Sequence, residues 1–217
     1  MVPFAGRIRN GGFSFDGVDY ELPATAGPHA IHGYGFVSAW TRVGDSAIQW
    51  EFGEPWPFAG RVTQRYWLSE SDLTIEMSVE ATDRQPMLVG WHPWFVRENS
   101  AGRLEVEFPA ESMYQRDAEG MPGELTSVRP GPWDDCFTNL SGSPRLRWGN
   151  LEVTLSSDLD HWVVYDEPDH ALCVEPQSGP PNQINTNPRV LDPGDHFTTT
   201  FTLSFSKIPA STHNQCG

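Results

Sequence analysis

The sequence predicts an all-β fold, a large antiparallel β-sandwich, and three observations indicate it. Apolar and polar residues alternate with a period of two in almost every readable segment, as they do along half-buried strands. Glycine and proline, at 20 and 19 of the 217 residues, separate these short runs. No segment has the apolar spacing of an amphipathic helix. Short strands joined by turn-rich connections are typical of a sandwich.

Two hairpin turns organise the first part of the chain. Asp16-Gly17 separates two alternating runs, and Asp-Gly in that position is a strong signal for a tight hairpin. Gly44-Asp45 separates a second pair of runs in the same way. A polar turn at 69–72 then precedes a long half-buried strand. The strands expected here are 13–15, 18–22, 39–43, 47–52, 62–68 and 73–81.

The rest of the chain contains three clear strands, at 104–108, 151–155 and 197–206. Two regions rich in Gly and Pro, 111–136 and 175–187, are expected to be irregular. Long ordered loops on a β scaffold usually carry the functional site. We expect one domain over residues 1–208, followed by a flexible tail at 209–217.

The charge balance limits the classes of partner. The chain has 14 Lys and Arg against 29 Asp and Glu, a formal net charge of -15. Such a chain is not expected to bind nucleic acid or an anionic membrane. No run is long enough to span a membrane, and residues 1–7 lack a signal-peptide pattern. Cys136, Cys173 and Cys216 are widely spaced without metal-type pairing, which favours a reduced, cytoplasmic location.

A carboxylate and an imidazole are the main candidates for catalysis. An apolar strand at 171–174 runs into Glu175, which Pro176 follows. A carboxylate placed there is costly unless it has a partner or a task, although a residue at a strand end can also simply cap a turn. His92 lies among aromatic residues and also precedes a proline. One carboxylate and one imidazole on stiffened strand ends suit general acid/base chemistry.

Other polar residues give weaker signals. His29 and His32 resemble a metal pair only on a helix, which the flanking Pro and Gly oppose, so we expect no zinc site. The chain also lacks a Gly-rich phosphate loop and a nucleophile elbow, and we expect no cofactor. Asp134 and Asp135 are adjacent and on a strand would face opposite sides, so at most one should serve a common site. Arg7 has apolar neighbours, which makes a buried, paired guanidinium conceivable.

Five short segments in order resemble the motifs of the aldose 1-epimerase (galactose mutarotase) family. They are Pro3-Phe-Ala-Gly-Arg-Ile8, Ile31-His-Gly33, Gly90-Trp-His-Pro-Trp-Phe95, Trp133-Asp-Asp-Cys-Phe137 and Val174-Glu-Pro-Gln177. The set is far more specific than any one of its members. The resemblance implies a galactose mutarotase-like supersandwich with a sugar site across a concave sheet.

The resemblance also implies roles for individual residues. Glu175 would be the general base and His92 the general acid. His32 would act near the ring oxygen, and Asp134 and Arg7 would bind sugar hydroxyls. Gln177 is a further expected substrate contact. Apart from the resemblance, Trp94 is expected to border the sugar, and packing beneath the site is the equal alternative.

Two features depart from the family pattern. Gly6 stands where the family usually has Asn, so one hydroxyl contact is expected to be lost. Family members normally have strands before the arginine motif, which here lies at the start of the chain. We therefore expect either an upstream start or an uncovered sheet edge along the apolar segment Val2–Phe4, with poor solubility as its consequence.

The expected activity is interconversion of the α and β anomers of a free monosaccharide by acid/base ring opening. A hexose-6-phosphate 1-epimerase is one alternative, but it needs several basic residues around the phosphate, and the sequence shows no basic cluster. A non-catalytic carbohydrate-binding protein of the same fold is another, and it would not need Glu175 and His92 together. A glycosidase would need two carboxylates and would leave His92 idle. The pattern predicts neither the sugar nor the oligomeric state.

Overall fold

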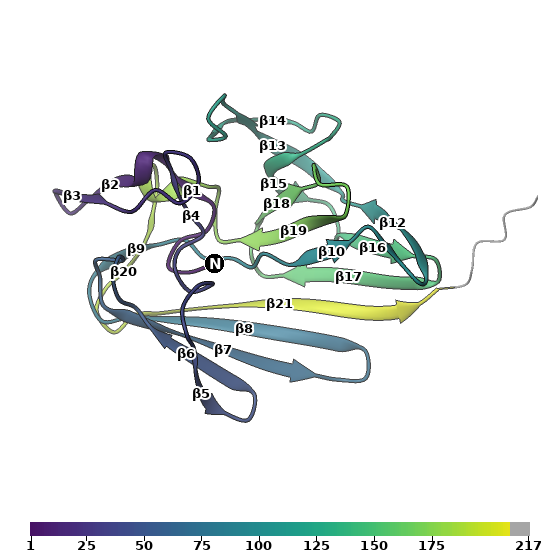
Figure 1. The fold of residues 1–217 in the computed structure, drawn as a ribbon, viewed down its shortest axis with the longest axis horizontal. Helices are drawn as coiled ribbons and strands as arrows, with labels where there is room; N and C mark the ends of the chain where they lie inside the picture. Colours follow the sequence, from purple (N-terminus) through teal and green to yellow (C-terminus); the bar gives the residue numbers. More distant parts are fainter. Residues whose placement is uncertain (209–217) are drawn as a thin grey trace, which may run out of the picture.

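A nine-stranded sheet forms one layer of the fold in the computed structural model, which describes residues 1–208. Figure 1 shows its long strands running side by side. The two longest strands, β8 and β21, lie at the centre of this sheet. The strand at the end formed by β11 is the shortest. In order across the sheet, the strands are β11 (Glu98–Asn99), β12 (Gly102–Glu107), β16 (Arg145–Trp148), β17 (Leu151–Ser157), β21 (His196–Lys207), β8 (Asp72–Ala81), β7 (Gly60–Leu68), β6 (Ala47–Glu51) and β5 (Thr41–Gly44).

A six-stranded sheet forms the second layer, in the order β10 (Trp94–Val96), β19 (Ala171–Gln177), β18 (His161–Tyr165), β15 (Asp134–Leu140), β13 (Ala110–Arg116) and β14 (Pro122–Ser127). The fold also contains three separate two-stranded sheets: β1 (Arg7–Ile8) with β4 (Ala30–Ile31), β2 (Gly12–Phe15) with β3 (Val18–Glu21), and β9 (Gln85–Met87) with β20 (Arg189–Leu191). The described helices are the 3₁₀ turns η1 (Arg9–Gly11) and η2 (Gln183–Asn185).

The predicted fold class is confirmed, because these are large antiparallel sheets with almost no helix. Within residues 1–208, every pair of neighbouring named strands is antiparallel, including the central pairs β7–β8 and β8–β21. None of the helical turns described there has the length and apolarity that crossing a membrane requires. The expected tail at 209–217 lies outside the described residues.

Aromatic side chains join the two large sheets. Phe201 on β21 is 1% exposed, and its ring lies 6.4 Å from that of Trp162 on β18. The ring of Trp91, just before the six-stranded sheet begins, lies 5.7 Å from Phe201. Trp91 immediately precedes His92, so this aromatic cluster supports the segment that carries the candidate acid. The alternation of Phe with Thr along β21 is what turns Phe201 toward the core.

Both predicted hairpins are present. Asp16 and Gly17 have φ values of 49° and 79°, the left-handed conformation that a two-residue turn between β2 and β3 requires. The second hairpin joins β5 and β6, and their register shifts near Gly44. The long strand predicted at 73–81 corresponds to β8.

The prediction that residues 111–136 are irregular is largely wrong. It contains β13, β14 and the start of β15. Proline misled the interpretation, because Pro122 lies in β14, an edge strand, where a missing backbone donor is tolerated. The 175–187 loop also begins later than expected, since β19 continues to Gln177. Pro176 keeps its place in that strand opposite Trp162.

The expected uncovered apolar edge near the start of the chain is also wrong. Val2 and Phe4 are 1% and 0% exposed. The Val2 carbonyl accepts hydrogen bonds from the backbone N–H groups of Tyr34 and Gly35, each at 3.0 Å. The Phe4 ring packs against the rings of Tyr34 and Trp56. The segment is therefore covered by the chain that follows it.

Replacing Phe201 by Ala should lower the free energy of unfolding by about 3–5 kcal/mol, because it opens a cavity between the sheets. Phe205→Ala is the matched control. It lies on the same strand but is 41% exposed, so its loss should be about 1 kcal/mol or less. Urea unfolding followed by tryptophan fluorescence measures both. Equal losses in the two variants would contradict this description of the core.

Candidate active site

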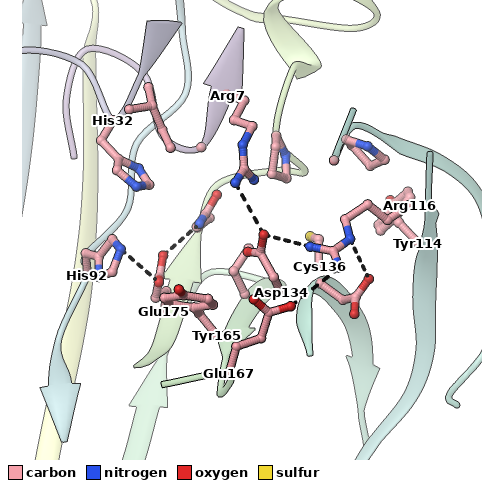
Figure 2. A pocket seen from close by; sticks show the side chains of 18 residues that line it. Arg7, His32, His92, Tyr114, Arg116, Asp134, Cys136, Tyr165, Glu167 and Glu175 are labelled. Atoms are coloured by element: carbon pink, nitrogen blue, oxygen red, sulfur yellow. Dashed lines mark hydrogen bonds and ion pairs between the residues drawn. The ribbon is translucent and has the colours of Figure 1, made fainter. Parts of the chain in front are cut away.

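A cavity of about 350 Å³ lies against one face of the six-stranded sheet, with β1 and β4 on its other side. Its volume is within the range of small-molecule sites. Figure 2 shows the side chains that converge on it. Six of the seven site residues that the sequence predicted line this cavity: Arg7, His32, His92, Asp134, Glu175 and Gln177. The chain thus brings together residues from five distant segments.

Glu175 and His92 are in contact. β10 pairs with β19 so that Trp94 lies opposite Cys173, and this register carries His92 alongside Glu175. His92 Nε2 lies 3.2 Å from Glu175 Oε1. The Glu175 side chain is only 2% exposed, and Gln177 Nε2 donates to its other oxygen at 3.3 Å. Glu175 and Gln177 share a face because side chains alternate along a strand.

The protonation of this pair follows from its burial. Burial, and then the Asp134 carboxylate, raise the pKa of Glu175 to about 8, against the lowering effect of the Gln177 hydrogen bond. Burial also lowers the pKa of the His92 imidazole from its ordinary value. Both shifts disfavour the charged forms. At neutral pH the pair therefore holds one proton between its two members, and the proton-binding steps belong to the pair.

His32 borders His92, and a strained turn holds it there. His32 and Gly33 both have left-handed backbones, with φ values of 64° and 66°. Only glycine fits at position 33, where a Cβ would lie 2.3 Å from the Val2 carbonyl oxygen. The His32 and His92 rings meet edge to face at 4.8 Å. Burial, and then His92, lower the pKa of His32 to about 3, so this imidazole is neutral near pH 7.

Asp134 lies at the centre of an ionic network. Arg7 Nη2 lies 3.2 Å from its carboxylate, and Arg116 Nη1 lies 2.7 Å from the same oxygen. Asp135 binds Arg129 at 2.7 Å and approaches Arg116 at 3.7 Å. The paired guanidinium expected for Arg7 is therefore present, although it is partly exposed.

Two expectations need correction here. Asp134 and Asp135 were expected to serve different faces, yet both line the cavity and both approach Arg116. Asp134 is the first residue of β15, so the regular alternation of a strand does not yet apply to it. The inference that the chain has no basic cluster was also wrong. Arg7, Arg116 and Arg129 converge on these two carboxylates from separate parts of the sequence.

Trp94 is the predicted site residue that does not line the cavity. Its ring stacks on His92, with centroids 5.5 Å apart and planes 21° apart. The His170 ring is also stacked with it, 6.3 Å away at 9°. Trp94 therefore packs against the candidate acid and is not part of the cavity wall.

The glycine in place of the usual Asn has a structural cause. Gly6 has a φ of 63°, and a Cβ there would lie 2.7 Å from the Pro181 side chain. Any larger residue would require both a strained backbone and displacement of the loop after β19. The His32 backbone N–H donates to the Gly6 carbonyl at 2.9 Å, so this glycine still helps to position the cavity wall.

Sequence reasoning missed several residues of the cavity. Arg116, Tyr114 and Tyr165 line it, and no local motif marks them, because each comes from a strand without a recognisable pattern. One possible metal-binding group also exists among residues 1–208: donor atoms of His92, Cys173 and Glu175 lie within 4.8 Å of one another. Burial raises the pKa of the Cys173 thiol, which keeps it protonated at neutral pH.

The chain is similar in sequence to several known proteins. The uncharacterized protein YphB of Escherichia coli K12 is 30% identical over 158 residues, which cover 69% of this chain and 52% of YphB. A galactose mutarotase of Bos taurus is 29% identical over 147 residues, or 60% of this chain and 42% of that protein. The chain thus spans about half the length of these relatives.

Solved structures show the same fold. A putative aldose 1-epimerase from Escherichia coli K12 superposes with a TM-score of 0.82 at 20% identity, covering 95% of this chain and 82% of the other. A galactose mutarotase-like protein from Clostridium acetobutylicum gives a TM-score of 0.80 at 17% identity, with 94% and 78% covered. The family model described as Aldose 1-epimerase matches residues 1–204. Because that match runs through nearly the whole described chain and includes every residue of the cavity, the chain belongs to the aldose 1-epimerase family.

Proposed function

We propose that this chain is an aldose 1-epimerase that interconverts the α and β anomers of a free monosaccharide. The observation that carries the proposal is the 3.2 Å contact between the buried Glu175 carboxylate and His92 Nε2 at the edge of a sugar-sized cavity. A carboxylate and an imidazole that share one proton are the two groups that reversible ring opening needs.

The reaction moves two protons. The reacting form of the one-proton pair carries its proton on His92, so that Glu175 takes the proton of the C1 hydroxyl while His92 gives its proton to the ring oxygen. The bond between C1 and the ring oxygen breaks, and C1 becomes an aldehyde. Rotation about the C1–C2 bond presents the other face of the aldehyde, and the steps then run in reverse. Each group recovers its starting protonation state, so no co-reactant is consumed.

The remaining residues of the cavity would hold the sugar. The Asp134 carboxylate accepts hydrogen bonds from sugar hydroxyls, while Arg7 donates them and keeps Asp134 in place. Neutral His32 lies at the edge of the His92 ring, where the sugar ring oxygen must arrive. Gln177 orients Glu175, and its carbonyl oxygen has no hydrogen-bond partner among residues 1–208, so it can meet a hydroxyl. Trp94 acts indirectly by holding the face of His92.

The decisive substitution is Glu175→Gln, which keeps the shape of the side chain and removes the base. The value of kcat should fall about 100-fold or more, while sugar affinity changes far less. Polarimetry of freshly dissolved α-glucose and α-galactose measures the rate, and calorimetry measures binding. Glu76→Gln, on the opposite sheet and paired with Arg65, is the matched control and should retain full activity. Full activity in Glu175→Gln would move the base to another residue.

His92→Asn should lower kcat to a similar extent. The double variant with Glu175→Gln should be little slower than the slower single variant, because both groups serve one concerted transfer. Multiplicative losses in the double variant would show that the two side chains act in separate steps.

The pH dependence follows from the shared proton. The productive state holds one proton, so kcat/KM should be highest between the two proton-binding steps. It should fall toward high pH near 8, where Glu175 and His92 lose that proton, since the pKa of Glu175 is raised to about 8. It should fall again in acid, below the ordinary histidine range, because the pKa of His92 is lowered. Initial mutarotation rates from pH 4 to 10 test this. A rate that keeps rising above pH 9 would exclude the one-proton state.

A second candidate is an epimerase of anionic sugars such as hexose 6-phosphates. Arg7, Arg116 and Arg129 near the cavity favour it. Against it, each of these guanidinium groups already faces a carboxylate, which offsets the positive charge an anion would need. Comparing kcat/KM for glucose and glucose 6-phosphate decides between the two.

A wild-type protein that binds sugar without speeding mutarotation would favour the remaining alternative, a non-catalytic carbohydrate-binding protein of the same fold. The cytoplasmic location stays a prediction.

A further inference from the structure

A chain of three polar side chains reaches the cavity at the end far from His92. His161 Nδ1 lies 2.6 Å from Asp160 Oδ1, and His161 Nε2 lies 3.1 Å from the Tyr114 hydroxyl. The Tyr114 and His161 rings also stack, with centroids 5.8 Å apart. Tyr114 lines the cavity, whereas the other two residues lie behind it. The acid/base mechanism uses none of the three.

The register of the sheet places Tyr114 in line with the candidate base. Glu175 on β19 is opposite Val163 on β18, and Val163 is opposite Cys136 on β15. The pairing of Met113 with Phe137, extended by one residue, puts Tyr114 opposite Cys136. These four residues all line the cavity and form one row across three strand spacings, roughly 14 Å at the level of the backbone. The row is polar at its two ends, with a less polar floor between them.

The hydrogen bonds allow an arrangement in which the Tyr114 hydroxyl points its proton away from the cavity. The Asp160 carboxylate accepts from His161 Nδ1–H. In the tautomer that carries its only ring proton on Nδ1, Nε2 is an acceptor, and the Tyr114 O–H donates to it. The Tyr114 oxygen keeps its lone pairs for the cavity and can only accept there. Among residues 1–208 it has no other hydrogen-bond partner.

We propose that Tyr114 is a specificity-determining residue that accepts a hydrogen bond from a sugar hydroxyl on the ring edge opposite C1, and that Asp160 and His161 set this polarity. The inference rests on the proposed function. A pyranose with C1 at Glu175 and its ring over Val163 and Cys136 brings its C3 and C4 hydroxyls toward Tyr114. Tyr114 thus belongs to substrate selection and not to proton transfer.

The first test compares Tyr114→Phe with wild type, using whichever of glucose and galactose wild type epimerises faster. Removal of one hydrogen-bond acceptor should raise Kd and KM about three- to tenfold and leave kcat within about twofold. Tyr66→Phe is the matched control, because its hydroxyl bonds to Gln64 on the other sheet. It should change neither constant. Circular dichroism and thermal unfolding confirm that both variants keep the fold.

The second test identifies the hydroxyl and the polarity of the bond. The 3-deoxy and 4-deoxy sugars are titrated against wild type and Tyr114→Phe. Removal of the contacted hydroxyl should weaken binding to wild type relative to the parent sugar. Tyr114→Phe should bind that deoxy sugar and the parent sugar with equal affinity. The matching deoxyfluoro sugar should bind wild type as weakly as the deoxy sugar, because fluorine cannot donate to Tyr114. In His161→Phe the Tyr114 O–H is free to donate, so the fluoro sugar should bind more tightly than the deoxy sugar.

The outcomes separate this inference from the proposed function. Unchanged Kd and KM in Tyr114→Phe, with normal sugar binding by wild type, would overturn the inference alone. A kcat loss of 100-fold in Tyr114→Phe would also overturn it, since the residue would then act in catalysis. Wild type that binds sugar but does not epimerise it would overturn the proposed enzyme and leave the role of Tyr114 measurable by Kd. Wild type that binds neither sugar overturns both.

Discussion

The buried carboxylate of Glu175 is the constraint on which the site depends. Every residue of β19 is buried, so this strand has no solvent to stabilise a charge. An isolated carboxylate there would simply keep its proton. His92 and Gln177 supply polar partners on its two oxygens, and they arrive only because β10 and the bridge at Gly90 align with β19. Burial thereby favours a state in which Glu175 and His92 share a single proton.

The two large sheets contribute differently to the site. The six-stranded sheet supplies most of the cavity, with His92 just before its edge strand, while the nine-stranded sheet supplies the apolar layer beneath it. Phe201 and Trp91 connect the two immediately below His92. The short strands β1 and β4 close the cavity from the other side and bring Arg7 and His32. Side chains held on strands and short turns lose little freedom when a sugar binds.

Much of the fold follows from local pattern, and part of the site does too. Period-two alternation predicts β8 and β21 well, since half-buried strands must repeat every second residue. Glu175 and His92 are visible because each interrupts an apolar segment beside a proline. Arg116 and Tyr114 could not be predicted, because only strand register places them at the cavity. Region 111–136 was misread because Gly and Pro report turns but do not exclude an edge strand such as β14.

The Arg7–Asp134 ion pair joins residues 127 positions apart, and this separation has a consequence for how the protein folds. Contacts that close such long loops form only after the chain has lost much of its conformational entropy. We therefore expect the site to assemble late in folding, once β1 docks against the six-stranded sheet. A chain in which β1 has not docked would lack one wall of the cavity, so a ligand that binds this cavity should favour the fully folded state.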